Sequence, residues 1–155
     1  MIELLAVNKT YNAGQPNQYT AVRGVDLCIE AGRTTALRGP SGSGKTTLLA
    51  LIGGLTRPSA GRVRLDGRDI SALSERFLTE LRRATFGFVF QQFQLIRGLS
   101  VLENVMLPAI PAVHSHRATR ARALELLENL GLAARAETRA HWLSGGEAQR
   151  VAIAR

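Results

Sequence analysis

Residues 39–47 read GPSGSGKTT. They match the pattern G-x-x-x-x-G-K-[ST], in which a glycine-rich loop directs successive backbone N–H groups toward an anion. An apolar segment ends at Leu37 and another begins at Leu48, so the flanks predict a strand before the loop and a helix after it. The dipole of that helix adds positive potential at the loop. The stretch therefore predicts a site for the phosphates of a nucleotide, and the plainer alternative is a glycine-rich turn.

Two side chains of this loop have predicted roles. We expect Lys45 to reach the terminal phosphates and the Thr46 hydroxyl to complete the coordination of a Mg²⁺ ion. The other predicted nucleotide-binding positions belong to the loop or to its junction with the helix: Gly39, Pro40, Ser41, Gly42, Ser43, Gly44 and Thr47.

The composition suits one domain and argues against a nucleic-acid partner. The net charge of +8 comes almost entirely from arginine, since Lys9 and Lys45 are the only lysines, and the arginines are spread along the 155 residues. Two basic stretches, 82–83 and 117–122, are interpreted as solvated helix faces, with contacts to nucleic acid or anionic lipid as the alternative. No apolar run approaches the roughly 18 residues of a membrane span. We therefore expect a soluble chain that reaches a membrane only through a partner.

The few cysteines and histidines limit the chemistry further. Cys28 is the only cysteine, and its apolar-rich surroundings over 25–29 predict a buried thiol in a reducing, cytoplasmic compartment. His114 and His116 are too few for a metal site.

Hydrophobic patterns and turn signals divide the chain into short elements. They predict strands over 2–7, 25–29, 34–37 and 62–65, and helices over 45–52, 75–83, 101–107 and 117–130. Residues 86–90 are apolar enough for a buried strand, which presents Gln91 and Gln92 at its C-terminal end. Ligands bind at such ends in α/β sheets.

A second glycine-rich motif, LSGGE, covers residues 143–147. Ser144 with Glu147 three residues later is a capping box, so the plain interpretation is the start of an ordinary helix at Gly145. The two glycines beside the cap add something more, because they let backbone N–H groups at the positive helix end approach an anion closely.

The phosphate loop, the glutamine after residues 86–90 and LSGGE, in this order, resemble the ATP-binding subunits of ABC transporters over residues 1–155. The resemblance implies an α/β fold of the P-loop NTPase class, ABC ATPase type. Such a fold has an N-terminal antiparallel β part, a RecA-like core and a helical subdomain. The resemblance assigns residues 1–91 to the β part and nucleotide-binding core, 92–143 to the helical subdomain, and 144–155 to the signature helix.

The resemblance also implies roles for individual residues. Tyr11 matches the aromatic residue that stacks on the adenine of ATP, although it is alternatively a plain loop aromatic. Gln91 matches the glutamine that senses Mg²⁺ and the attacking water, with Gln92 as its neighbouring competitor. The signature positions, which in the family contact the γ-phosphate of ATP on the opposite subunit, are Ser144, Gly145, Gly146 and Glu147. The last of these is more often glutamine in the family, which leaves its own contact less defined.

Within the family, FVFQQFQLIRGLSVLENVMLPAI over 88–110 resembles the branch of lipoprotein release, macrolide export and antimicrobial-peptide export. This implies a head-to-tail dimer of ATPase subunits at the inner face of the plasma membrane, driving transmembrane permease subunits that largely choose the cargo. Residues 95–105 are then a candidate coupling surface or, alternatively, part of the helical core. Trp142 is interpreted as a packing residue.

The family pattern continues after the signature helix with a strand that ends in a Mg²⁺-binding aspartate and a catalytic glutamate, followed by a switch histidine. The sequence ends at Arg155 before these residues, so it is interpreted as the N-terminal part of an ATPase subunit, with the core truncated after the signature helix. We expect little or no ATP hydrolysis by the 155 residues alone. The alternatives are a soluble ABC-type ATPase acting on nucleic acid or ribosomes, a non-catalytic nucleotide-binding module, and a small-molecule phosphotransferase, which leaves LSGGE unexplained.

Overall fold

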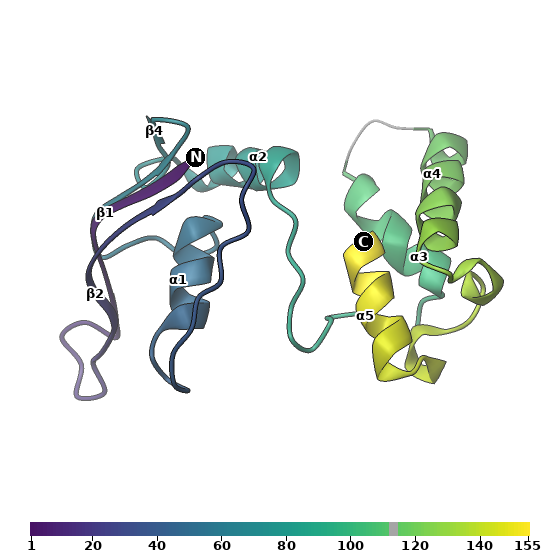
Figure 1. Ribbon diagram of the computed structural model, residues 1–155, viewed down its shortest axis with the longest axis horizontal. Coiled ribbons are helices and arrows are strands. Elements are labelled where there is room, and N and C mark those ends of the chain that lie inside the picture. The colour runs from purple at the N-terminus through teal and green to yellow at the C-terminus, as the bar shows by residue number, and fades with distance from the viewer. Residues whose placement is uncertain (112–114) are drawn as a thin grey trace. The chain divides into compact units, whose positions relative to one another are not determined.

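The computed structural model describes residues 1–111 and 115–155, and the chain divides into two compact units, 1–87 and 88–155 (Figure 1). His114 lies outside the described residues. Each unit has its own hydrophobic core. The predicted three-part division at residues 91 and 143 stays a prediction.

The N-terminal unit is built on one antiparallel sheet with the strand order β2-β1-β3-β4. The strands are β1 (Ile2–Tyr11), β2 (Tyr19–Ile29), β3 (Ala60–Leu65) and β4 (Arg68–Asp69). The β1 and β2 strands are longer than predicted. A bulge at Ala6, whose φ is +47°, turns both Leu4 and Val7 toward the core, although strict alternation would separate them.

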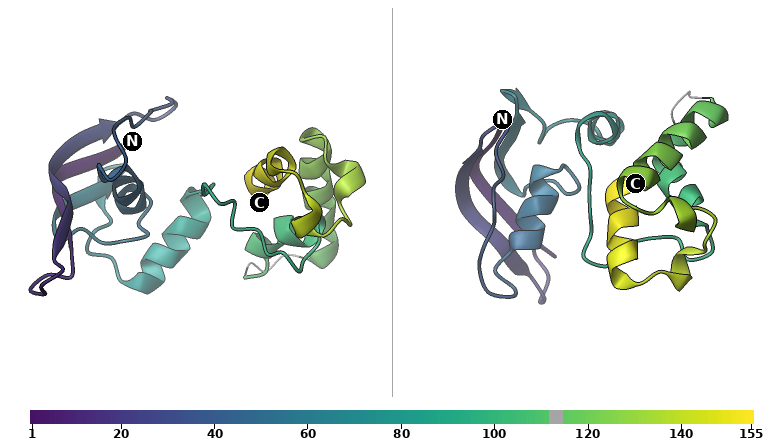
Figure 2. Two further views of the ribbon diagram at one scale, coloured as in Figure 1. Left: turned by 90° about the horizontal axis from the view of Figure 1, so that it is seen from below. Right: turned by 45° about the vertical axis from the view of Figure 1, so that its right-hand side comes forward.

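Two helices complete this unit, and α1 lies against one face of the sheet (Figure 2). They are α1 (Lys45–Ile52), with the predicted bounds, and α2 (Glu75–Thr85), which is slightly longer than predicted. Leu51 and Ile52 of α1 and Leu78 of α2 are buried with the inward side chains of the strands. The core therefore fixes the end of α1 and leaves its first turn free to meet a ligand.

Two predicted strands are wrong. Residues 34–37 are not a strand, and neither are residues 86–90, where the side chains of Val89 and Phe90 are 55% and 44% exposed. Apolar residues make a strand only where a neighbouring strand takes up their backbone hydrogen bonds. The order β2-β1-β3-β4 gives neither segment a place in the described sheet.

The C-terminal unit, 88–155, is helical. Its elements are α3 (Val101–Met106), η1 (Leu107–Ala109), α4 (His116–Asn129), η2 (Ala133–Arg135), η3 (Ala140–Trp142) and α5 (Gly145–Ala154). A serine caps each α-helix by accepting a backbone N–H: Ser100, Ser115 and Ser144. The predicted helices over 101–107 and 117–130 are confirmed to within a residue, and Gly131 ends α4 with a φ of +68°.

The core of the helical unit includes part of residues 95–105. Val101, Leu102 and Val105 are buried against Leu127 of α4 and Val151 of α5. The end of this stretch is therefore part of the core, while residues 96–98 are exposed and their role as a coupling surface stays a prediction.

Two single-residue predictions are also wrong. Cys28 is exposed, because Val25, Leu27 and Ile29 face inward and the alternation of β2 turns Cys28 outward. Trp142 is 74% exposed in η3, with its ring centroid 4.9 Å from that of His141. Among the described residues, none of the helices combines the length and apolar character that crossing a membrane requires.

Candidate nucleotide-binding site

The loop 39–44 joins an irregular segment to α1 and depends on glycine for its shape. Gly44, the N-cap of α1, has a φ of +85°, and a Cβ atom there would lie 2.3 Å from the carbonyl oxygen of Ala21. A Cβ at Gly39 would lie 2.9 Å from Ser43 Oγ. Any side chain at Gly44 would push the loop away from β2, so the close approach of backbone to backbone requires glycine.

The first turn of α1 has no side-chain cap and no acidic residue. The first N–H groups of a helix have no partner within the helix, and a capping side chain normally satisfies one of them. Together with the helix dipole, these N–H groups make the start of α1 a favourable place for an anion. Thr46 is exposed in this turn, as a Mg²⁺ ligand would need to be, and Thr47 is half-buried.

Lys45 folds back over the loop. Its Nζ donates to the carbonyl oxygens of Gly39 and Pro40, at 3.0 and 2.7 Å, and to Ser43 Oγ at 3.3 Å. The ammonium group is therefore held where it faces the loop, by neutral acceptors. Phosphate oxygens are stronger acceptors for an ammonium group, so an incoming phosphate would displace these contacts favourably.

A recess of about 360 Å³ lies beside the loop, within the N-terminal unit. It is lined from β2 by Val22 and Val25 and from the loop by Gly39, Ser43 and Lys45. Arg23 and Arg38 also line it, and the lining residues include no carboxylate. The recess therefore favours an anionic ligand.

Tyr11 and Tyr19 are paired across β1 and β2 at the end of the hairpin. Lys9 places its Nζ 5.0 Å from the centre of the Tyr11 ring and donates to the Arg57 carbonyl at 2.8 Å. The Tyr19 hydroxyl donates to the carbonyl of Gly42 at 3.3 Å, which links the tyrosine pair to the phosphate loop. Sequence reasoning singled out Tyr11 and missed Tyr19, because only the strand register reveals that the two rings are opposite each other.

The two glutamines lie in the helical unit, in an exposed turn that follows Phe90. Both glutamines are exposed, so exposure does not distinguish them. The choice of Gln91 over Gln92 therefore stays a prediction. The Phe93 N–H donates to the Phe90 carbonyl at 2.9 Å, and the Gln94 N–H to the Gln92 carbonyl at 2.6 Å. This turn belongs to a different unit from the phosphate loop.

The predicted capping box at the signature is confirmed. Ser144 Oγ accepts the Glu147 N–H at 3.3 Å, and Glu147 Oε2 accepts the Ser144 N–H at 2.8 Å. These hydrogen bonds from Ser144, with the nearby Arg135 guanidinium at 3.1 Å, lower the pKa of Glu147 below its ordinary value of 4.5. A Cβ at Gly145 would meet no described atom within 4 Å. The fold of the unit therefore does not require glycine at this position.

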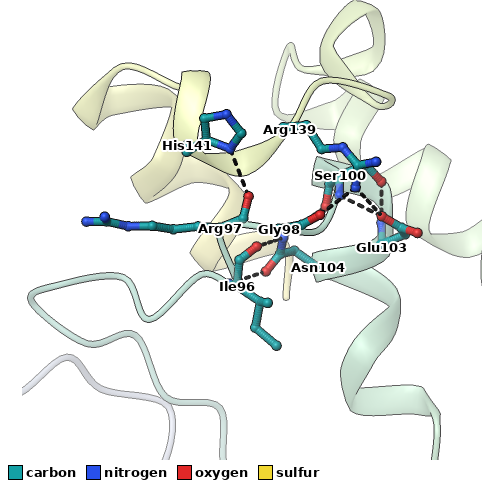
Figure 3. Close-up of polar contacts among 8 residues, drawn as sticks. All are labelled: Ile96, Arg97, Gly98, Ser100, Glu103, Asn104, Arg139 and His141. Atoms are coloured by element: carbon teal, nitrogen blue, oxygen red, sulfur yellow. Dashed lines mark hydrogen bonds and ion pairs between the residues drawn. The ribbon is translucent and has the colours of Figure 1, made fainter.

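A polar network fixes the segment between the glutamines and the signature (Figure 3). Asn104 is fully buried: its Oδ1 accepts the Ile96 N–H at 2.8 Å, and its Nδ2 donates to the carbonyls of Ile96 at 3.1 Å and Ser100 at 2.9 Å. Ser100 and Glu103 form a second capping box, whose hydrogen bonds lower the pKa of Glu103.

The same network reaches the residues just before the signature (Figure 3). Arg139 donates to the Gly98 carbonyl, and His141 Nδ1 lies 3.0 Å from the Arg97 carbonyl oxygen. Segments about 40 residues apart are thereby tied together. Sequence reasoning missed Asn104 and Arg139. The Ser100–Glu103 spacing was the one local signal for this network.

The described residues offer few side chains that could bind a metal ion. Among the residues that the structure describes, no three His, Cys, Asp or Glu side chains gather as a metal site would need. A Mg²⁺ ion here would depend on the Thr46 hydroxyl and on phosphate oxygens, which is how Mg²⁺ is usually held beside nucleotides.

Comparison with known proteins identifies the family. The model of the ABC transporter family matches residues 22–155. The pyoverdine export ATP-binding/permease protein PvdT of Pseudomonas fluorescens is 46% identical over all of this chain and 24% of its own length. The macrolide export ATP-binding/permease protein MacB of Marinobacter nauticus is also 46% identical, over the same shares. The chain thus spans about a quarter of the length of these relatives, and macrolide export is among the predicted branches.

Solved structures agree with this assignment. The dimeric structure of MJ0796, a bacterial ABC transporter cassette, has a TM-score of 0.89 and 44% identity, over 99% of this chain and 68% of that one. A post-hydrolysis state of the same dimeric cassette, bound to ADP and Pi, has a TM-score of 0.90. The predicted fold class, an α/β P-loop NTPase of the ABC ATPase type, is confirmed. With a family match over residues 22–155 and a fold shared with these cassettes, the chain belongs to the ABC transporter family.

Proposed function

We propose that this chain is the ATP-binding part of an ABC export transporter and that residues 39–47 hold the phosphates of ATP. One observation carries the proposal: the uncapped start of α1 and the Lys45 ammonium group converge on one glycine-rich loop. Lys45 binds the terminal phosphates in place of the loop carbonyls that it now contacts. Tyr11 stacks on the adenine with the ring face that Lys9 leaves open.

A Mg²⁺ ion beside the phosphates would neutralise part of their negative charge. Thr46 would supply a hydroxyl ligand from α1, and Gln91 of the helical unit is proposed as the glutamine that senses the ion. The exposure of both side chains supports these roles, since each is free to meet a ligand.

The signature acts on the ATP of a second subunit. Gly145 and Gly146 are exposed at the first turn of α5, and neither fits so tightly against the fold that it must be glycine. Their small size instead suits close approach by a phosphate to the backbone N–H groups. Ser144 and Glu147 hold this turn in shape through the capping box. Two subunits then close head-to-tail, each loop facing the partner's signature, in keeping with the dimeric cassettes that the chain resembles.

The names of the relatives, ATP-binding/permease proteins, support a membrane partner for this chain. We infer that this chain works at the cytoplasmic face of the plasma membrane with a permease part, which largely selects the exported substrate. The domain division predicted from sequence, at residues 91 and 143, belongs to this proposal.

Residues 1–155 alone are proposed to bind ATP without turnover. The recess beside the loop is lined by basic and apolar residues, and its lining offers no carboxylate to act as a general base. Glu147 is engaged with Ser144 and Arg135, and its lowered pKa makes it a poor proton acceptor.

Calorimetric titration with MgATP tests the binding. The 155-residue chain is expected to bind, and Lys45→Ala to lose affinity by about tenfold to a hundredfold, the usual effect of removing a charged hydrogen-bond donor. Arg76→Ala is a matched control, because Arg76 is an exposed cation on α2 and its one ion pair among the described residues is with Glu80. Equal affinities for Lys45→Ala and the unmutated chain would contradict the proposal, as would rapid hydrolysis by the 155 residues alone.

A further inference from the structure

The turn after the glutamines has an unfavourable backbone. Phe93 and Gln94 have φ values of +57° and +52°, so two consecutive residues with side chains occupy the left-handed region. Residues other than glycine avoid this region, and they stay there only where the surroundings hold them. Something must therefore hold this turn in place.

Arg155 provides that contact from the far end of the signature helix. Its Nη1 donates to the Gln94 carbonyl at 2.7 Å, and its Nη2 lies 3.4 Å from the Phe93 carbonyl oxygen. The planar guanidinium thus spans the carbonyls of both strained residues, an arrangement that the single ammonium group of lysine does not reproduce. No carboxylate forms an ion pair with Arg155 in the described chain.

Arg155 is itself firmly placed. It directly follows α5, at the end marked C in Figure 1, and the residue is half-buried. Val151 and Ala154 of the last helical turn are buried in the core of the helical unit. The helix from Gly145 to Ala154 is about 15 Å long at 1.5 Å per residue and connects the signature rigidly to this contact.

We propose that Arg155 is a positioning residue that clamps the turn carrying Gln91 and Gln92 and couples it to the signature helix. The effect on ATP rests on the proposed function, in which Gln91 serves the subunit's own nucleotide and the signature serves the partner's. Under that function, α5 moves when its signature contacts the partner subunit's ATP. Arg155 then transmits this movement to Gln91, which serves the subunit's own ATP. The clamp itself depends only on contacts within residues 88–155.

The test uses the full-length protein that carries this chain, with three variants. Arg155→Ala removes the clamp, and Arg155→Ala with Gln94→Gly removes it while also relieving the left-handed backbone at one position. Arg117→Ala is the control, because Arg117 is an exposed arginine at the start of α4 and forms no ion pair in the described part of the chain.

Hydrogen exchange of the amides of residues 92–95 is measured together with MgATP affinity and hydrolysis. Arg155→Ala is expected to exchange about tenfold faster in this turn and to hydrolyse about tenfold more slowly, with affinity changed by less than about twofold. Gln94→Gly is expected to restore part of the hydrolysis in the double variant, since glycine adopts the turn without a clamp.

Unchanged exchange in Arg155→Ala would overturn the inference. So would a loss of hydrolysis that Gln94→Gly does not relieve and that accompanies faster exchange throughout residues 88–155, because that pattern means general damage to the helical unit. Failure of the unmutated protein to bind MgATP would instead refute the proposed function, and exchange at residues 92–95 would still decide whether Arg155 holds the turn.

Discussion

Asn104 holds the loop before α3 in shape, and its removal has a calculable effect. The side chain is fully buried and makes three hydrogen bonds, two with the backbone of Ile96 and one with the carbonyl of Ser100. At a net contribution of about 1 kcal/mol each, Asn104→Ala should lower the free energy of unfolding by about 3 kcal/mol. Ser100 keeps one partner, since its carbonyl also accepts the Asn104 N–H at 3.0 Å. Most of the loss therefore arises at Ile96.

Urea denaturation of Asn104→Ala and the unmutated protein measures this difference. Asn129→Ala is the matched control, because Asn129 is exposed at the end of α4 and its loss should change stability by less than about 0.5 kcal/mol. Hydrogen exchange at the Ile96 amide should rise in Asn104→Ala and stay unchanged in the control. A loss of stability no larger than that of Asn129→Ala would refute the reasoning that these buried hydrogen bonds organise the loop.

Three further predictions concern the site. Gly145→Ala should leave the melting temperature unchanged or slightly raised, since a Cβ there meets no described atom, yet it should abolish ATP-dependent dimerisation in size-exclusion chromatography if phosphate approaches this turn. Tyr19→Phe should weaken ATP binding by about twofold to tenfold through loss of the hydrogen bond to Gly42, and equal affinities in calorimetry would contradict that link. The folded-state pKa of Glu147 lies below its ordinary value of 4.5, so its stabilising effect is present above that pH and disappears as pH falls through the folded pKa. Thermal melts between about pH 3 and 6 should therefore show a flatter pH dependence for Glu147→Gln, and an unaltered slope would count against the capping carboxylate.

Local patterns predicted the parts of the molecule that local interactions determine. The bounds of α1 and the capping box of α5 follow from sequence, because a glycine loop, apolar spacing and a serine cap act within a few residues. The burial of Cys28 was predicted wrongly, because composition alone does not say which face of β2 a residue occupies.

Contacts between residues far apart in the chain could not be predicted from the sequence. Segments 34–37 and 86–90 have the apolar residues of strands. Their composition does not show whether a neighbouring strand is available to pair with them. Asn104 is an ordinary helix residue until the fold brings Ile96 to it, and Arg155 contacts carbonyls about 60 residues earlier in the chain. Only the packed helical unit shows these contacts.

Hydrogen exchange of the amides of residues 41–47, with and without MgATP, tests most directly whether this loop holds the phosphates. MgATP is expected to slow exchange there in the unmutated chain, because the backbone N–H groups of the loop and of the first turn of α1 bind phosphate oxygens. The protection should be lost in Lys45→Ala at the same ATP concentration. Exchange that MgATP leaves unchanged at residues 41–47, at a concentration that saturates binding elsewhere, would contradict the assignment of this loop as the nucleotide site.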